Sequence, residues 1–225
     1  MRFREKEAIP AQTPITYAGR LDPMAEGLVL MLTADACKEK DTYLAREKTY
    51  DFEVLIGIST DSYDVLGRIT GVKADMAGQI DEGAIAEAMR RAADKPLPYP
   101  SYSSKPVAGK PLFVYARSGE VPPSVPLQAA VPIEIECTGI RLVQLHEITR
   151  EVLLDIEKVQ GDFRQKEIID SWNSCEAAHS GAALIVATFH TRVPSGVYIR
   201  SIAHALGQEL AVPSLAYRII RTRIG

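Results

Sequence analysis

The alternation of apolar and polar residues along the chain predicts several strands. Residues 48–58 place Tyr50, Phe52, Val54, Ile56 and Ile58 on every second position, which is typical of a strand with one buried face. Similar strands are expected at 131–137, through 140–145, at 182–189 and at 216–221. Residues 28–32 are wholly apolar, which predicts a short strand buried on both faces.

Helical periodicity separates these strands. Asp81 is expected to cap a helix reaching Ala93, whose inward positions are Ile85, Ala88 or Met89, and Ala92. Other helices are expected from Thr33 or Asp35 to about Arg46, twice between 147 and 180 around Gly161-Asp162, and up to Leu210. Strands and helices in this order predict an α/β (α+β) fold with a mixed sheet, built as one domain over 1–225.

Composition narrows the class of protein. The chain has 225 residues, and no apolar run approaches the roughly 20 residues needed to cross a bilayer. Its charged N-terminus lacks the apolar segment of a secretory signal. The 3 cysteines, Cys37, Cys137 and Cys175, lie far apart and in no metal-ligand spacing. We therefore expect a cytoplasmic protein with no disulfide, no metal site and no membrane contact.

The formal net charge of −3 does not by itself indicate nucleic-acid binding. Basic residues nevertheless gather in two stretches, 101–117 and 190–225, while acids concentrate at 75–94 and 147–176. The basic stretches could form one phosphate-contacting face, and the alternative is an ordinary solvated surface.

A single carboxylate, Asp22, lies in a turn between Gly19 and Gly27, directly before the apolar run. Pro23 biases Asp22 away from helical dihedrals and cannot donate to a strand ladder. Spacing alone is compatible with an ordinary Asp-Pro turn whose carboxylate is solvated. An acid held on a loop beside a rigid strand is also a suitable catalytic group.

The order of residue types in this stretch favours a catalytic role for Asp22. Gly-Arg-Leu-Asp-Pro-x-Ala-x-Gly-Leu-Val-Leu, at 19–30, resembles the catalytic-aspartate motif of pseudouridine synthases, and the proline after the aspartate is similar to the TruB branch. Further similar blocks follow in order: Lys48-x-Tyr50, the Thr-Asp-x-x-Asp-x-x-Gly of 60–67, the loop and short helix of 100–119, the Ser-Gly-x-Tyr-Ile-Arg-Ser of 195–201, and the terminal strand.

This resemblance implies a fold and a set of roles. The family fold is a bent, mostly antiparallel sheet with flanking helices and a central RNA cleft. Asp22 would be the nucleophile, Arg200 would keep it ionised, and Tyr50 would stack on the target uracil and accept a proton from its C5. As a lone feature, a tyrosine at the start of a strand is more often a core aromatic than a platform for a base. Contacts with the substrate are expected from Tyr17, Arg20, Lys48, Lys105, Lys110, Arg117, Tyr198 and Ile219.

Two of these residues carry a more specific expectation. Tyr198 would help to orient Arg200, and the alternative is a packed core residue. Ile219 would pack against the catalytic pocket. The reaction needs no cofactor or metal.

Three departures from the family pattern bear on the substrate. Tyr17 stands where TruB-type enzymes usually carry a histidine, residues 147–180 look like an inserted pair of helices, and the small PUA domain is not expected after Gly225. The insertion would pack on the sheet, since Trp172 needs burial, although it could instead clamp RNA. The acids of 60–67 are interpreted as a polar turn rather than an acid pair or a metal site.

Three functions remain open from the sequence. The first is a monomeric tRNA pseudouridine synthase acting on the T-arm, at a T-loop uridine expected to be uridine 55 of tRNA. The second is the same chemistry on ribosomal RNA. The third is a catalytically silent RNA-binding or tRNA-folding factor, against which the joint presence of Asp22, Tyr50 and Arg200 argues, because binding alone does not require them.

Overall fold

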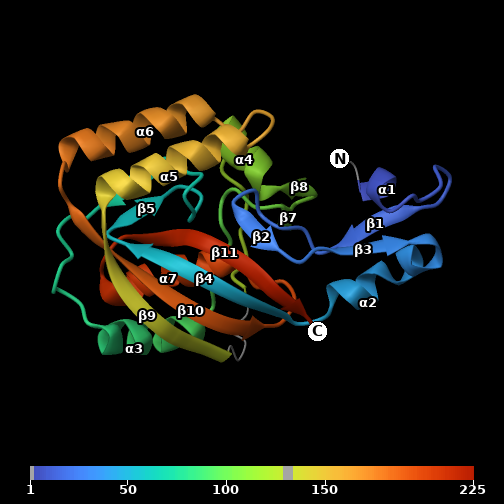
Figure 1. Ribbon diagram of the computed structural model, residues 1–225, viewed down its shortest axis with the longest axis horizontal. Helices are drawn as coiled ribbons and strands as arrows, with labels where there is room; N and C mark the ends of the chain where they lie inside the picture. The colour runs from blue at the N-terminus through green and yellow to red at the C-terminus, as the bar shows by residue number, and fades with distance from the viewer. Residues whose placement is uncertain (1–2, 129–133) are drawn as a thin grey trace.

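A five-stranded sheet forms the centre of the computed structural model, which describes residues 3–128 and 134–225. Its strand order is β2-β11-β4-β10-β9, and neighbours are antiparallel except for β2, which runs parallel to β11 (Figure 1). The strands are β2 (Ala25–Gly27), β4 (Lys48–Ile56), β9 (Glu134–Gln144), β10 (Ala183–Val193) and β11 (Ser214–Ile224). The expected mixed, mostly antiparallel sheet is therefore confirmed.

Register shifts in two of the strand pairs shape the sheet. The pairing of β9 with β10 shifts register between Thr188 and Phe189, and the chain continues through Gly139 as one strand. The prediction of two separate strands here is wrong, because a bulge absorbs the extra residue without ending the ladder. Residues 131–133 of the first predicted strand lie outside the described residues. In the pairing of β11 with β4 the register shifts at Tyr217 and again at Thr222.

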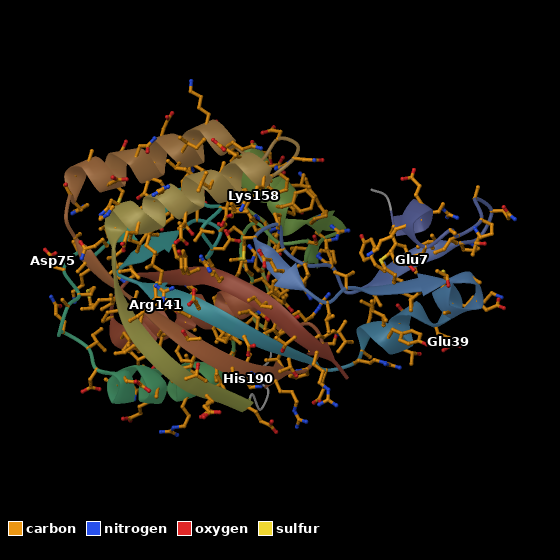
Figure 2. All side chains as sticks on the ribbon, in the orientation of Figure 1. Glu7, Glu39, Asp75, Arg141, Lys158 and His190 are labelled. Carbon is orange, nitrogen blue, oxygen red and sulfur yellow. The ribbon has the colours of Figure 1, made fainter. Side chains whose placement is uncertain are left out.

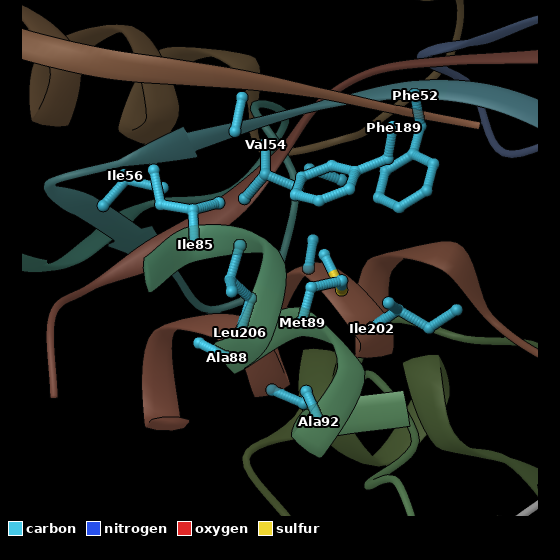
Figure 3. Packing of buried hydrophobic residues seen from close by; sticks show 14 of the residues in the cluster. Phe52, Val54, Ile56, Ile85, Ala88, Met89, Ala92, Phe189, Ile202 and Leu206 are labelled. Atoms are coloured by element: carbon cyan, nitrogen blue, oxygen red, sulfur yellow. The ribbon is translucent and has the colours of Figure 1, made fainter. Parts of the chain in front are cut away.

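Helices cover one face of the sheet as predicted. α3 (Glu82–Ala93) and α7 (Ile199–Leu210) pack together there, and the Asp81 side chain accepts a hydrogen bond from the Ala84 amide. Figure 3 shows Phe52, Val54 and Ile56 of β4 facing side chains of α3 and α7. All four predicted inward residues of α3 are buried: Ile85, Ala88, Met89 and Ala92.

A second helical layer lies on the opposite face (Figure 1). α5 (Leu145–Lys158) and α6 (Gln165–Ala178) form the pair of helices expected around Gly161-Asp162. Gln144 and Glu147 cap α5 reciprocally at its first turn. Trp172 is fully buried and packs with Leu55, Leu184 and other sheet residues, so this pair does pack on the sheet.

The N-terminal residues form a unit that projects from the sheet. It contains α1 (Phe3–Lys6), β1 (Ile15–Ala18), β3 (Leu30–Thr33), a 3-10 helix η1 (Ala34–Glu39) and α2 (Lys40–Leu44). β1 and β3 pair only with each other, and the labelled Glu7 and Glu39 lie in this unit in Figure 2.

Two predictions for this unit are wrong. Leu28 and Val29 are 51% and 43% exposed, and only Leu32 of the apolar run is buried, because β3 lies outside the main sheet. The helix expected to run unbroken to about Arg46 is divided between η1 and α2, and the Thr33 side chain makes no cap hydrogen bond. Local apolarity could not indicate that this strand has a single partner.

Shorter elements lie between the main strands. β5 (Ile58–Thr60) and β6 (Ile69–Val72) form a hairpin whose turn contains 60–69, while β7 (Pro106–Val107), β8 (Lys110–Pro111) and α4 (Leu112–Ser118) follow the proline-rich loop. Within the described ranges, no helix has both the length and the apolar character needed to span a membrane.

Candidate active site

Asp22 and Arg200 form a bidentate ion pair across the molecule. Asp22 lies in the loop before β2, where its carbonyl oxygen accepts a hydrogen bond from the Ala25 amide at 2.9 Å. Arg200 is the second residue of α7. Its Nε lies 2.7 Å from Oδ2 of Asp22, and its Nη2 lies 2.8 Å from Oδ1. The guanidinium is 3% exposed and the carboxylate 31%, so a buried cation holds an acid that still reaches solvent.

The remaining donors of Arg200 are bound by two other segments. Nη1 lies 3.3 Å from Oδ2 of Asp64 and donates to the Ser62 carbonyl at 2.9 Å. The Tyr102 carbonyl accepts from Nη1 and Nη2 at 3.3 Å. Burial alone would lower the pKa of Arg200, but the carboxylates of Asp64 and Asp22 outweigh it and raise that pKa. Arg200 is therefore a fixed positive charge.

Asp64 is a site residue that the sequence interpretation missed. Its carboxylate accepts hydrogen bonds from the Ser62 hydroxyl at 2.6 Å and from the Leu66 amide at 3.0 Å. Burial raises the pKa of this carboxyl, while Arg200 and the Ser62 hydrogen bond oppose the shift. The turn of 60–67 was correctly predicted as a turn. One available signal for a further role was that Asp64 directly precedes Val65 and Leu66, two apolar residues that are buried.

A cavity of about 680 Å³ opens beside Asp22; we call it the large cavity. This volume falls within the range of pockets that bind small organic groups. Predicted site residues make up much of its wall: Tyr17, Arg20, Asp22, Lys48, Tyr50, Tyr198 and Ile219. The structure therefore gathers residues from both ends of the chain around one acid.

Tyr50, on β4, lines the large cavity and packs partly on the core. Burial raises the pKa of its hydroxyl, and the nearby Arg221 guanidinium opposes that shift. The phenol is therefore neutral at neutral pH. Ile219, on β11, is 4% exposed and lies opposite Phe52 in the strand ladder.

Arg221 is a second residue that sequence reasoning did not single out. Its side chain is 2% exposed and lines the large cavity. Nε donates to the Leu28 carbonyl at 2.6 Å, and Nη2 donates to the Gly19 carbonyl at 2.9 Å. Arg221 thus ties together both ends of the segment that carries Asp22. Its spacing of two from Ile219 in a strand was the available signal, since alternation puts both on one face.

Two predicted contacts take a different form. The Lys48 ammonium donates to the carbonyls of Leu44 and Arg46, both at 2.6 Å, so it ties the end of α2 to β4 as well as lining the cavity. Burial and Arg221 lower its pKa. Tyr198 stacks edge-on against Tyr99 at 5.6 Å, and among the described residues the hydrogen bonds of Arg200 go elsewhere. Arg200 is contacted instead by the carbonyl groups of Ser62 and Tyr102 and by the Asp64 carboxylate, and an orienting role for Tyr198 stays a prediction.

A second cavity, of about 280 Å³, lies on the other side of the 20–23 loop; we call it the small cavity. Asp22, Arg200 and Arg20 line it together with Tyr102, Arg117 and Arg164. Lys105 and Lys110 line neither cavity: Lys105 lies over the ring of Tyr99, and Lys110 pairs with Glu120 at 2.8 Å.

Several arginines of the second basic stretch are buried or paired with acids. Arg200 and Arg221 are buried in the site, whereas Arg192 pairs with Glu134 and Arg218 with Glu151. Near the mouth of the large cavity, Arg20 and Lys40 flank the ring of Tyr17 at 5.8 and 5.6 Å. Within residues 3–128 and 134–225, no group of three or more His, Cys, Asp or Glu side chains is arranged to hold a metal ion.

Comparisons with known proteins give similarities over almost the whole chain. The curated tRNA pseudouridine synthase B of Lactobacillus delbrueckii subsp. bulgaricus is 27% identical over 212 residues, which is 94% of this chain and 59% of that protein. Proteins of the same name from Mesomycoplasma hyopneumoniae and Bacillus licheniformis are 28% and 27% identical, and the match spans 51% and 56% of their lengths. The chain therefore spans between half and three fifths of these relatives.

A solved Cbf5-Nop10-Gar1 complex contains a chain similar to this one at 16% identity, with a TM-score of 0.45 over 94% of this chain and 40% of that one. The family model described as TruB family pseudouridylate synthase (N terminal domain) matches residues 7–163. That match covers well over half of the sequence and includes Asp22, Tyr50 and Asp64. The chain belongs to the TruB family of pseudouridylate synthases.

Proposed function

We propose that this chain catalyses the conversion of a uridine in the T-loop of tRNA to pseudouridine, with Asp22 as nucleophile. The observation that carries the proposal is the half-open carboxylate of Asp22, paired with the buried Arg200 and facing a cavity walled by Tyr50. The names of the curated relatives support tRNA as the substrate class.

The reaction exchanges one bond of the sugar for another. The C1′–N1 bond breaks, the uracil turns, a C1′–C5 bond forms, and the hydrogen of C5 moves to the freed N1 by way of a base. A carboxylate that adds covalently to the sugar or to the base during the exchange must be ionised. Desolvation in general favours the protonated form of a carboxyl group, and a cation within about 4–6 Å opposes this. Arg200 supplies that cation at hydrogen-bonding distance.

Tyr50 and Ile219 would hold the base within the large cavity. Tyr50 presents an aromatic face for stacking and a hydroxyl for the proton of C5, and Ile219 closes the apolar side. The target nucleotide must leave its stack to reach Asp22, at a cost of a few kcal/mol. Loop nucleotides cost less to extrude than paired ones, which favours a T-loop uridine.

Pseudouridine mapping tests the proposal. Purified protein is incubated separately with a tRNA transcript, with a T-arm stem-loop and with a ribosomal RNA fragment, and each RNA is mapped for pseudouridine. Modification of the tRNA and the stem-loop at one loop uridine is expected, and Asp22→Asn should abolish it. Modification of the ribosomal RNA alone would assign the chemistry to another substrate, and RNA binding without product would identify a silent binding factor.

Four sequence predictions stay predictions here. They are the single catalytic domain, the status of α5 and α6 as an insertion, the monomeric state and the cytoplasmic location. Tyr17 remains the proposed replacement for the family histidine, since it lies at the cavity mouth between two cations.

A further inference from the structure

Arg164 connects the α5–α6 pair to the turn that carries Asp64 and to the loop that carries Tyr102. Its Nη1 lies 2.7 Å from Oδ2 of Asp61 and its Nη2 lies 3.3 Å from Oδ1, a bidentate contact. Its guanidinium carbon lies 3.8 Å from the centroid of the Tyr102 ring. One planar cation therefore binds an acid along its edge and an aromatic ring on its face, which a lysine cannot do.

The two groups that Arg164 contacts belong to the two segments that hold Arg200. Asp61 precedes Ser62 and Asp64, whose carbonyl and carboxylate contact Nη1 of Arg200. The Tyr102 carbonyl contacts Arg200 as well. Apart from Asp22, every hydrogen-bond or ion-pair partner that the structure gives to the Arg200 side chain lies on one of these two segments.

α6 holds the same turn at its far end. The Trp172 indole donates to the Gly67 carbonyl at 3.3 Å, and the Ile69 amide donates to the Ser171 hydroxyl at 3.0 Å. Arg164 therefore acts near the start of the turn, and Ser171 and Trp172 act near its end. The pair of helices supports the turn from both sides.

The backbone of Arg164 is consistent with a fixed role. Its φ of 60° and ψ of 33° lie in the left-handed region, which is unfavourable for a residue that carries a Cβ. Such a conformation persists where the surrounding contacts determine it. Here those contacts are the ion pair with Asp61 and the stack on Tyr102.

We propose that Arg164 is a positioning residue, which holds the Asp61 turn against the Tyr102 loop and so fixes Arg200 in the geometry that binds and aims Asp22. The proposal rests on the proposed function and assigns to the α5–α6 pair a role beyond packing. Because the Arg164 side chain also lines the small cavity, direct contact with RNA is the competing account that the experiment separates.

The main test compares Arg164→Ala with Arg164→Gly at saturating RNA under single-turnover conditions. Glycine suits the left-handed backbone, so a loss shared by both variants belongs to the guanidinium rather than to backbone strain. We expect the rate to fall about tenfold to a hundredfold, as for other displacements of a catalytic group. The RNA dissociation constant should change less than about twofold, since the position of Arg200 affects the rate of the chemical step and not the affinity for RNA.

Two matched variants serve as controls. Lys158→Ala removes a cation from the end of α5, where the Lys158 ammonium pairs with Asp155 (Figure 2). Arg68→Ala removes the other arginine side chain that contacts Asp61, while the amide of residue 68 still donates to that acid. Among the described residues, neither side chain makes a hydrogen bond or ion pair with Tyr102 or Arg200, so both variants should keep the wild-type rate.

A readout without RNA separates this proposal from the proposed function. The Nε–Hε resonance of Arg200 in the free protein should shift and exchange faster with solvent in Arg164→Ala and Arg164→Gly, and not in the controls. Fluorescence of Trp172, the only tryptophan, shows whether α6 remains docked. Arg164→Lys, which keeps a charge opposite Asp61, should stay docked and turn over severalfold more slowly than wild type.

Three results would overturn the proposal: rates within twofold of wild type in all Arg164 variants, a loss found entirely in the RNA dissociation constant, or an unchanged Arg200 resonance. If the wild-type protein makes no pseudouridine, the proposed function fails, and the Arg200 resonance still decides whether Arg164 positions that guanidinium.

Discussion

Nη1 of Arg200 lies 3.3 Å from Oδ2 of Asp64, and it is a different nitrogen from the two that bind Asp22. One guanidinium thus bridges a carboxylate that faces the large cavity and a carboxylate that is buried behind it. Asp64 does not line the large cavity; it lines the small cavity together with Asp22 and Arg200, and its ion pair with Arg200 joins it to the catalytic pair.

Asp64→Asn tests this relationship through activity. Asparagine keeps the shape and the hydrogen-bonding oxygen but removes the charge that orients Arg200. We expect single-turnover rates to fall about tenfold or more, as expected for a misplaced catalytic partner, with little change in RNA affinity. Rate and affinity measured on one tRNA transcript check this. A variant as fast as wild type would show that Asp22 alone positions the guanidinium.

The same variant tests stability against pH. Because burial raises the pKa of Asp64, the folded protein binds its proton more tightly than the unfolded chain. Stability should therefore fall as pH rises from the ordinary value of 3.8 through the raised pKa, and Asp64→Asn should lack this loss. Urea unfolding of both proteins at about pH 4 and pH 8 should show the asparagine variant gaining relative stability at the higher pH. A constant difference would contradict the raised pKa.

Tyr50→Phe separates stacking from proton transfer. The hydroxyl is neutral at neutral pH because burial raises its pKa, so its use as a proton acceptor is the demanding part of its role. We expect the variant to bind RNA within about twofold of wild type and to release tritium from C5-labelled uridine about a hundredfold more slowly, the scale of general-base catalysis. Tyr50→Leu, which loses the ring as well, is the comparison. Turnover by the phenylalanine variant at the wild-type rate would limit Tyr50 to stacking.

Arg221→Ala should weaken the segment that carries Asp22. The substitution leaves the carbonyl groups of Gly19 and Leu28 without the buried donors that now bind them. We expect a loss of about 1–3 kcal/mol in the free energy of unfolding. Arg221→Lys should recover only part of it, because one ammonium cannot reproduce the two-point contact. Urea unfolding followed by circular dichroism measures the stability of both variants. Equal stability of the two variants and the wild type would show that Arg221 does not hold the segment that carries Asp22.

Gly27→Ala and Gly109→Ala form a matched pair. Both glycines have positive φ, 104° and 78°, so each substitution adds backbone strain of about 1–2 kcal/mol. A Cβ on Gly27 would also lie 2.8 Å from the Arg221 amide nitrogen and closer still to its carbonyl oxygen, whereas one on Gly109 would meet nothing within 4 Å. We expect Gly27→Ala to destabilise the protein clearly more than Gly109→Ala and to reduce turnover. Similar unfolding midpoints would argue against the close pairing of β2 with β11.

Sequence patterns correctly predicted the elements that depend on local periodicity and capping. The strand beginning at Lys48, the helix capped by Asp81 and the pair of helices around Gly161-Asp162 follow from periodicity, and the structure contains all of them. The motif resemblance also directed attention to Asp22 and Arg200, which are 178 residues apart in the chain. Their separate positions carry no local signal of contact, so only the resemblance joined them.

The sequence could not predict which elements pack against one another in the fold. The apolar run after Gly27 has the composition of a buried strand, yet Leu28 and Val29 are exposed because β3 pairs only with β1. Asp64 lies in a turn and Arg221 in a strand, and neither position is unusual in the sequence. They belong to the site because the fold places α7 beside Asp64 and β2 beside Arg221. Lys48 was expected to face RNA, but its ammonium donates hydrogen bonds to two carbonyl groups at the end of α2.

The paired strands β1 and β3 with α2 contain only two fully covered apolar side chains, Ala18 and Leu32. An isolated two-stranded ribbon is barely stable in water, so this unit is expected to open far more often than the sheet does. Asp22, the proposed nucleophile, lies just past it, where Arg221 and Arg200 fasten the chain to the rigid part of the molecule. Amide exchange should therefore be fast up to residue 18 and slow from β4 onward, which would allow the outer ribbon to adapt its shape to an incoming RNA while the reacting acid stays still.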